Sequence, residues 1–292
     1  MNMKLSFLVL TLSILALTTS AQSYSRDSSW VRKGIINANL SQSSLSNWSA
    51  GGESAVGLES MLAYDINYKK GNQLWNNRFE FAYGLNYTDN NGTRKTNDKI
   101  YVSSTYGYQV VKNLYASALL SFQSQFAKGY NYDVNDINYI SRFLSPGYLT
   151  VGAGATWTPK PYFTATISPA TWRGTFVRDD SLANIGAYGV DEGDHLLSEF
   201  GANVKMEVTY EFLKNMTIYS RLNLYSNYLE DTKNVDVAWD VILNMKINSW
   251  FSASITTNLI YDNDQKIEQK DGTLSPKVQF KEVLGVGLHF SF

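Results

Sequence analysis

The sequence predicts an all-β chain: a transmembrane antiparallel up-and-down β-barrel of about twelve strands that follows a cleaved signal peptide. Three observations predict this fold: long apolar–polar alternation from Gly34 to Phe292, an N-terminal export signal, and short connections that alternate with longer ones. Charged residues make up 17% of the chain and aromatic residues 14%. With a mean hydropathy of -0.24, this composition suits strands that face lipid on one side and water on the other.

The N-terminus has the features of a secretory signal peptide, which we expect to span 1–21. Lys4 supplies a positive charge, an apolar run follows it, and Thr19-Ser20-Ala21 forms a small-residue cleavage site. The apolar run is shorter than the ~20 residues that a membrane-spanning helix needs. We therefore expect an exported chain in which 22–32 is a short periplasmic segment and 33–292 is an outer-membrane barrel.

Alternation with a period of two distinguishes strands from helices. In one segment Phe79, Phe81 and Tyr83 share a face, and Arg78 and Glu80 share the other. A helix would instead bring together residues three and four apart and mix these two sets. The same pattern predicts strands near 33–42, 54–69, 75–89, 97–109, 113–127, 147–159, 161–169, 198–212, 215–229, 233–247, 250–263 and 278–292.

The two faces of these strands differ in chemistry. One face is apolar, and its only charge is Glu282, near a strand end. An Arg or Lys at the membrane midplane on the lipid side costs about 2–4 kcal/mol. A face that meets hydrocarbon must therefore be nearly free of charge, as the apolar face is. The opposite face carries the candidates for lining the lumen: Glu59, Asp65, Arg78, Glu80, Lys99, Lys205, Glu207, Arg221, Asp236, Asp240 and Lys246.

The connections and the last strand support the same fold. Short connections are expected at 70–73, 111–113, 159–161, 213–215 and 248–249. Longer ones are expected at 43–53, 90–96, 128–146, 170–197 and 264–277, and 230–232 is too short to fit this rule well. Short periplasmic turns opposite longer outer loops are typical of membrane barrels. The alternation continues to Phe292, and a terminal Phe resembles the C-terminal signal of outer-membrane barrels.

Several motifs resemble a Bacteroidetes-type outer-membrane β-barrel family of unknown function. The most specific is Asn47-Trp48-Ser49-Ala50-Gly51-Gly52-Glu53. The others are Ser41-Gln42, Trp75-Asn76-Asn77, Ala82-Tyr83-Gly84, Lys95-Thr96-Asn97-Asp98-Lys99, Gln125-Phe126-Ala127-Lys128-Gly129-Tyr130, Ser145-Pro146-Gly147-Tyr148 and Tyr188-Gly189-Val190-Asp191. The resemblance implies a barrel in the outer membrane and no assigned catalytic residues.

The sequence leaves three functions open. We favour a non-enzymatic narrow channel for passive diffusion of small polar solutes. The first alternative is a plugged barrel that serves as a scaffold or accessory subunit of an envelope complex. The second is an outer-membrane phospholipase-like hydrolase, which needs a His beside a Ser nucleophile. His289 faces inward and no Gly-x-Ser-x-Gly segment is present, so we interpret His289 as a polar residue of the lumen.

Binding motifs are few. Trp48, Gly51 and Gly52 are candidates for a loop that constricts the lumen or docks a partner, against the simpler interpretation of an interfacial Trp beside a tight turn. The acids of Asp191–His195 with Glu199 match no defined metal spacing. With no cysteine and a net charge of -1, we expect no disulfide, no cofactor, no metal and no nucleic-acid partner. The expected partners are outer-membrane lipids, small polar solutes or an envelope protein.

Overall fold

A computed structural model describes residues 29–43, 54–132, 137–230, 232–268 and 273–292 of the chain. Twelve long strands dominate it: β1 (Trp30–Ser43), β2 (Ala55–Lys70), β3 (Gln73–Thr88), β4 (Gly92–Val111), β5 (Leu114–Ser124), β8 (Gly147–Lys160), β9 (Phe163–Phe176), β10 (Leu196–Leu213), β11 (Met216–Asn227), β12 (Asp236–Lys246), β13 (Phe251–Tyr261) and β16 (Gln279–Ser291). The predicted number of strands is confirmed.

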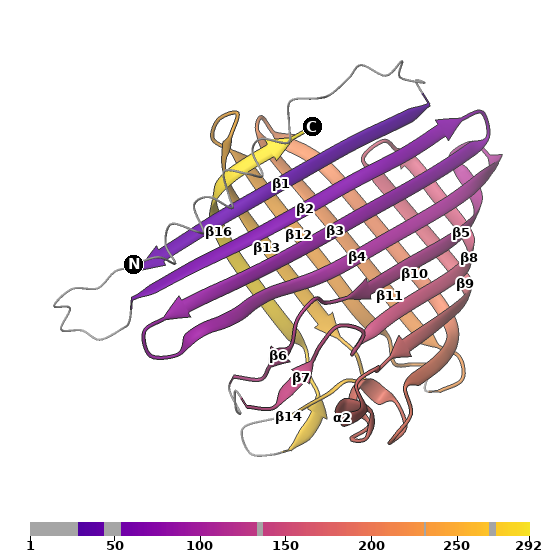
Figure 1. Cartoon of the computed structure of the whole chain (residues 1–292). Helices are drawn as coiled ribbons and strands as arrows, with labels where there is room; N and C mark the ends of the chain where they lie inside the picture. The colour runs from indigo at the N-terminus through magenta and orange to yellow at the C-terminus, as the bar shows by residue number, and fades with distance from the viewer. Residues whose placement is uncertain (1–28, 44–53, 133–136, 231, 269–272) are drawn as a thin grey trace.

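The strands form one closed antiparallel barrel (Figure 1). Each long strand pairs with its neighbour along the chain, in the order β1-β16-β13-β12-β11-β10-β9-β8-β5-β4-β3-β2. The first and last strands complete the circle by antiparallel pairing of Ile35–Leu40 with Val286–Ser291. None of the helices in the described part of the chain is long and apolar enough to cross a membrane.

Alternation sets which residues face outward. Large apolar side chains on the outer face are exposed, and these include Val56, Tyr106, Leu120, Phe200 and Trp239. Polar side chains of the same strands are buried inside, as the sequence pattern predicts. The barrel therefore has an inverted distribution relative to a soluble protein, whose apolar residues lie within.

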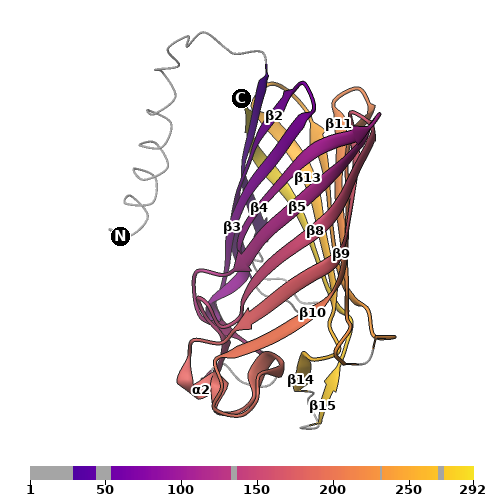
Figure 2. The same cartoon turned by 90° about the vertical axis from the view of Figure 1, so that its right-hand side faces the viewer.

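The two ends of the barrel differ (Figure 2). The chain's C-terminus and the short turns that follow β2, β4, β8, β10 and β12 lie at one end, which we call the turn end. Three of these turns use a residue in the left-handed region, where glycine and asparagine are tolerated best: Gly71, Asn113 and Asn215 have φ of 55°, 63° and 67°. The longer connections gather at the other end, which we call the loop end.

Three predicted connections differ in length from those in the structure. The connection predicted at 90–96 is a short turn, because β4 already begins at Gly92. The polar residues that open β4 show no apolar alternation, which hid the strand. The loop predicted at 170–197 is also too long, because β9 continues to Phe176. An irregularity in strand pairing near Ser168 interrupts the alternation there, so the pattern ended early. The connection predicted at 230–232 is longer, at 228–235.

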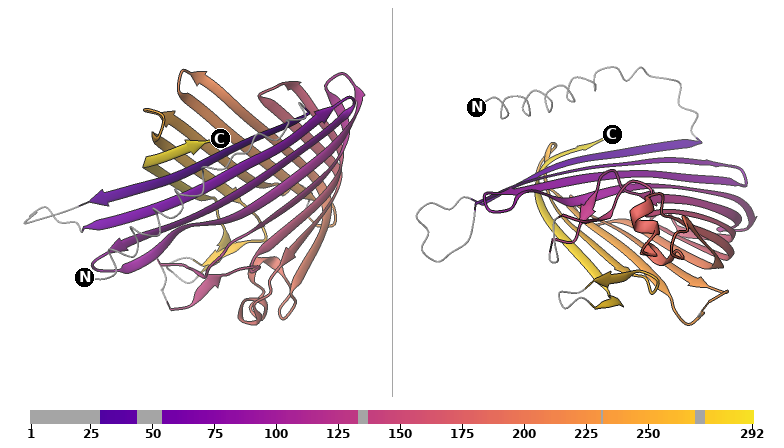
Figure 3. Two further views of the ribbon diagram at one scale, coloured as in Figure 1. Left: turned by 45° about the horizontal axis from the view of Figure 1, so that its top comes forward. Right: turned by 60° about the horizontal axis from the view of Figure 1, so that its bottom comes forward.

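The loop end carries a small folded cap (Figures 1 and 3). Its elements are β6 (Gly129–Tyr130), β7 (Tyr139–Ser141), α2 (Asp180–Ala183), η2 (Ala187–Gly189), β14 (Lys266–Glu268) and β15 (Leu274–Pro276). Val177, Leu182, Ala183 and Val190 form its buried apolar cluster. Because the connection between β9 and β10 has its own apolar core, the cap is an ordered structure that covers this end of the barrel.

Candidate functional site

The barrel interior holds two cavities that approach each other from opposite ends of the lumen. A cavity of about 710 Å³ opens at the turn end, and one of about 390 Å³ lies at the loop end. Lys205 of β10 lines both, although only 5% of it is exposed. The two cavities are thus separated by a thin layer of side chains.

That layer is an ionic girdle, by which we mean eight inward-facing residues: Asp65, Arg78, Glu80, Lys99, Lys205, Glu207, Arg221 and Asp240. Four are cations and four are carboxylates, so the girdle is neutral as a whole. All eight were lumen-lining candidates from the sequence. The structure brings them together at one level of the lumen.

The girdle crosses the full width of the lumen. In the circle of twelve strands, β3 and β11 are six places apart, and so are β4 and β12. Nevertheless Arg221 Nη1 of β11 lies 3.3 Å from Glu80 Oε2 of β3. Lys99 Nζ of β4 lies 2.9 Å from Asp240 Oδ2 of β12. Diametrically opposite walls are therefore joined by direct ion pairs.

Ion pairs along each wall complete the girdle. Arg78 binds Asp65 at 3.1 Å and Glu80 at 3.3 Å. Lys99 also reaches Glu80 at 3.0 Å, and Arg221 also binds Asp240. Asp65 pairs with Arg78, and Arg221 with Asp240, as direct neighbours on adjacent strands. Strand register thus places opposite charges side by side.

Two tyrosines hold the arginines from the opposite wall. The Arg78 guanidinium lies 3.9 Å from the ring centre of Tyr219, and that of Arg221 lies 3.8 Å from the ring centre of Tyr101. Arginine stacks on aromatic faces in this way because its charge is delocalised over a plane. Both tyrosines lie on strands that the sequence predicts, but their contact with the arginines was not predicted. The alternation of the two strands, which places Tyr101 and Tyr219 on the inward face, is the sequence signal that could have identified them.

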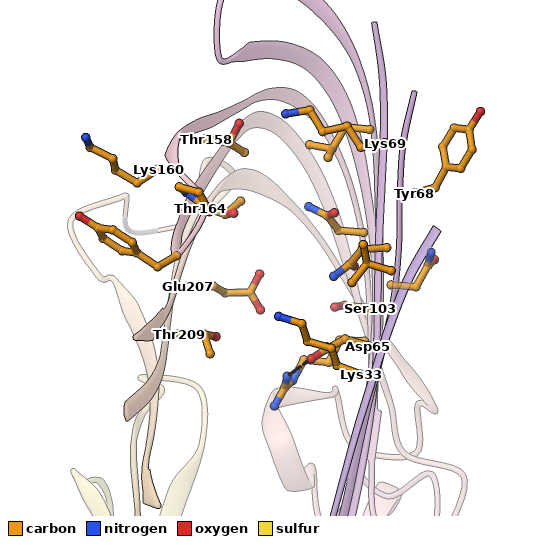
Figure 4. Close-up of a pocket in the computed structure, with 18 of the residues that line it drawn as sticks. Lys33, Asp65, Tyr68, Lys69, Ser103, Thr158, Lys160, Thr164, Glu207 and Thr209 are labelled. Carbon is orange, nitrogen blue, oxygen red and sulfur yellow. Dashed lines mark hydrogen bonds and ion pairs between the residues drawn. The ribbon is translucent and has the colours of Figure 1, made fainter. Parts of the chain in front are cut away.

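The turn-end cavity is lined by hydroxyl, amide and charged groups (Figure 4). Glu207 and Thr209 lie across it from Asp65 and Ser103 (Figure 4). Glu207 and Asp65 belong to the ionic girdle and also line this cavity. The cavity can therefore hold water and small polar molecules directly against the charged layer.

The loop-end cavity contains a second buried cluster. Arg173 forms a two-point ion pair with Glu199 at 2.6 and 2.7 Å, and it binds Asp236 at 2.5 Å. Its guanidinium also lies 4.0 Å from the ring centre of Tyr225, whose buried hydroxyl has no hydrogen-bond partner within the described part of the chain. Asp236 was a sequence candidate. Arg173 was missed because the predicted strand ended before it.

Glu59 and Lys246, the remaining candidates, lie outside both cavities. Glu59 accepts a hydrogen bond from Asn97 Nδ2 at 2.5 Å, near the junction of β1 and β16. Lys246 reaches Ser291 Oγ at 3.5 Å near the turn end. Trp48, Gly51 and Gly52 lie outside the described residues, so the proposed constriction or docking loop stays a prediction.

His289 is a buried lumen residue. It is 2% exposed, and its Nδ1 lies 2.8 Å from Asn37 Oδ1. Its Nε2 has no hydrogen-bond partner among the described residues.

Metal ligands do not gather in the described part of the chain: no group of three or more His, Cys, Asp or Glu residues there could hold an ion. Glu199, which the sequence grouped with the acidic loop before it, is instead bound by Arg173.

The cap is anchored at Asp179. Its carboxylate accepts hydrogen bonds from Arg142 at 2.7 Å, from the Tyr139 hydroxyl at 3.0 Å and from the backbone N–H of Leu182 at 3.1 Å. Burial by itself raises the pKa of Asp179, but these hydrogen bonds outweigh it and hold the pKa below its ordinary value. Asp179 thus links β7 to α2 above the loop-end cavity.

One family model matches part of the chain. The family model described as "Protein of unknown function (DUF3078)" matches residues 40–130. No curated protein matches the chain. The family match agrees with the expected resemblance to a family without an assigned function, and the Bacteroidetes-type part of that expectation stays a prediction.

Solved structures of similar architecture are distant. A NanC porin is 12% identical, with a TM-score of 0.38, over 88% of this chain and 98% of that chain. An outer membrane channel from Pseudomonas putida F1 is 10% identical, with a TM-score of 0.40, over 92% and 100%. The translocator domain of the autotransporter NalP from Neisseria meningitidis is 10% identical, with a TM-score of 0.36, over 99% and 95%. At such distances these similarities say nothing about what this chain carries or binds.

Proposed function

We propose that the protein is an outer-membrane β-barrel that acts as a narrow passive channel, with the ionic girdle as its constriction. The observation that carries this proposal is the pair of cavities that approach the girdle from opposite ends and share Lys205. Polar lining on both sides favours small polar solutes. Since the girdle is neutral, we expect weak selectivity between cations and anions.

The outer wall supports placement in a membrane. Its exposed apolar side chains form a surface of the kind that hydrocarbon requires, and closure leaves few free strand edges. Three tryptophans also satisfy their indole N–H on the neighbouring strand: Trp75, Trp172 and Trp239 donate to Ser104, Ser198 and Ser220 at 2.8, 2.8 and 3.0 Å. Such pairing matters where no water is available. We assign the turn end to the periplasm, following the usual position of short turns.

A second candidate is a closed barrel that serves as a scaffold of an envelope complex. The direct ion pairs between opposite walls favour it, because an ion must separate charged partners before it can pass. The cap on the loop end would then be the docking surface. Both candidates share the membrane barrel and differ in whether the girdle conducts.

Conductance in planar bilayers separates them. For a channel, we expect small steps from the unmodified protein, and steps at least about twofold larger from Glu80→Ala/Arg221→Ala, which removes one cation and one carboxylate from the girdle. Lys246→Ala is the matched control, since Lys246 lines neither cavity, and its steps should equal those of the parent. Silence of the parent, together with co-purification of one stoichiometric partner, would instead support the scaffold.

A further inference from the structure

The seam between β1 and β16 is paired over a shorter length than the other junctions of the barrel. β1 pairs with β16 at six positions, whereas it pairs with β2 at fourteen. Toward the loop end, Gln279–Gly285 of β16 pair with β13 alone among the described residues. Figures 1 and 3 show β1 and β16 diverging in this direction.

A cavity of about 350 Å³ lies at this divergence. Asn39–Ser41 of β1 and Lys281–Gly285 of β16 contribute to its lining, together with residues of β2, β3 and β4. Its size falls in the lower part of the range of about 300–1,000 Å³ that is typical of small-molecule sites. The cavity is therefore a gap in the barrel wall large enough for a ligand.

A free strand edge is costly in a membrane. Backbone N–H and C=O groups need partners where no water is present, and an unpaired edge leaves them without any. In the described part of the chain, the edge of Gln279–Gly285 that faces β1 makes no backbone hydrogen bond. The surroundings of this edge must therefore supply polar groups as well as apolar ones.

The charges around the gap are unequal. On the lumen side, Lys281 donates to Asn97 Oδ1 at 2.6 Å, and Asn97 donates to Glu59, so this cation and this carboxylate are linked through one amide. Glu282 takes no part in this linked pair. It is exposed on the outer, apolar face, and within the described residues no cation lies within ion-pair distance of it. An unpaired carboxylate on this apolar face attracts cationic groups from its surroundings.

Apolar side chains surround this carboxylate. Leu40 is 57% exposed and Leu284 is 64% exposed on the two sides of the gap, and both line the cavity with Leu58. Leu284 lies farther from the loop end than Glu282, so a molecule entering from the outer leaflet would meet the carboxylate first and the leucines beyond it.

We propose that the gap is a lateral opening that binds a single-chain amphiphile with a cationic head group, its head beside Glu282 and its chain against Leu40 and Leu284. The proposal rests on the membrane placement given above and is independent of whether the girdle conducts. It assigns the seam a ligand class different from the polar solutes of the lumen.

Cross-linking tests the gap itself, in a chain that has no native cysteine. Gln42→Cys/Leu284→Cys places thiols where β1 and β16 would pair if their register continued, and Ala38→Cys/Leu288→Cys places them at an observed pair. In phosphatidylcholine vesicles with an oxidant, we expect the control pair to form a disulfide at least tenfold faster. Equal rates would overturn the opening while leaving the membrane barrel intact.

Protection of a thiol tests the ligand. Ser41→Cys lies in the cavity lining, and Thr209→Cys in the turn-end cavity is the matched control. Dodecylammonium should slow the reaction of Ser41→Cys with N-ethylmaleimide at least threefold and leave Thr209→Cys unchanged, whereas dodecyl sulfate should protect neither. Glu282→Gln in the Ser41→Cys background should abolish the protection, and Glu192→Gln, at an exposed loop acid, should not.

Equal protection by both amphiphiles, or protection that survives Glu282→Gln, would overturn the proposed head-group recognition. Failure of the membrane placement is detected separately: the protein would then be extracted from membranes by alkaline carbonate without detergent.

Discussion

At the scale of single residues, the lumen is organised by charges that are buried in pairs. Glu80, Lys205 and Arg221 are each at most 5% exposed. A buried ion pair is poor evidence of added stability, because desolvation offsets much of the attraction. The arrangement instead fixes one geometry of the two opposite walls, since each girdle cation has a carboxylate within reach.

Removing one member of this set should be costly, because it leaves its buried partners without their counter-charge. Arg221→Ala leaves Glu80 and Asp240 with fewer cations, and we expect it to lower the free energy of unfolding by about 3–5 kcal/mol. Glu80→Ala/Arg221→Ala should lose less than the sum of the single changes, because the residues are coupled. Urea unfolding in lipid vesicles, followed by tryptophan fluorescence, measures both. A loss under about 1 kcal/mol for Arg221→Ala contradicts this account of the girdle.

Asp179 should make the cap sensitive to acid. Because its folded pKa lies below the ordinary value of 3.8, the folded cap binds fewer protons than the unfolded one. Its contribution to cap stability is therefore complete above about pH 3.8 and is lost as the pH falls through the folded pKa. Asp179→Asn should speed hydrogen exchange in α2 and β7 at pH 7, and the difference from the parent should shrink below pH 3.8. A difference that is constant with pH would exclude this role.

At the scale of elements, the long strands were predictable because one of their faces is apolar and the other is polar. The inward parity of Arg78, Glu80 and Arg221 follows from alternation alone. Strand ends were less predictable: β9 was cut short at the irregularity near Ser168, which shifts the alternation. The cap could not be predicted, because its apolar cluster of Val177, Leu182, Ala183 and Val190 follows neither a strand nor a helix period.

The tight turns offer a test at this scale. Asn215 has a φ of 67°, a region that costs most non-glycine residues roughly 1–2 kcal/mol. Asparagine tolerates it better than alanine does. Asn215→Ala should therefore destabilise the β10–β11 hairpin by about 1 kcal/mol, and Asn215→Gly should be close to neutral. The same urea unfolding experiment measures both, and equal losses in the two variants would contradict the conformational explanation.

At the scale of the whole molecule, closure determines which residues meet. The sequence identified the girdle residues as inward-facing, but it could not show that β3 opposes β11 or that β4 opposes β12. Those oppositions depend on the number of strands and on their stagger around the barrel. The short seam between β1 and β16 was equally hidden, because its register is fixed by the fold and not by either strand alone.

The central claim is that this barrel presents an apolar wall to lipid and a charged interior to itself. Single cysteines along β11, at Arg221, Leu222, Asn223 and Leu224, test it most directly in a chain without native cysteine. Each would carry a fluorophore in vesicles that contain a nitroxide-labelled lipid. We predict strong quenching at Leu222 and Leu224 and weak quenching at Arg221 and Asn223. Equal quenching at all four positions would contradict the claim.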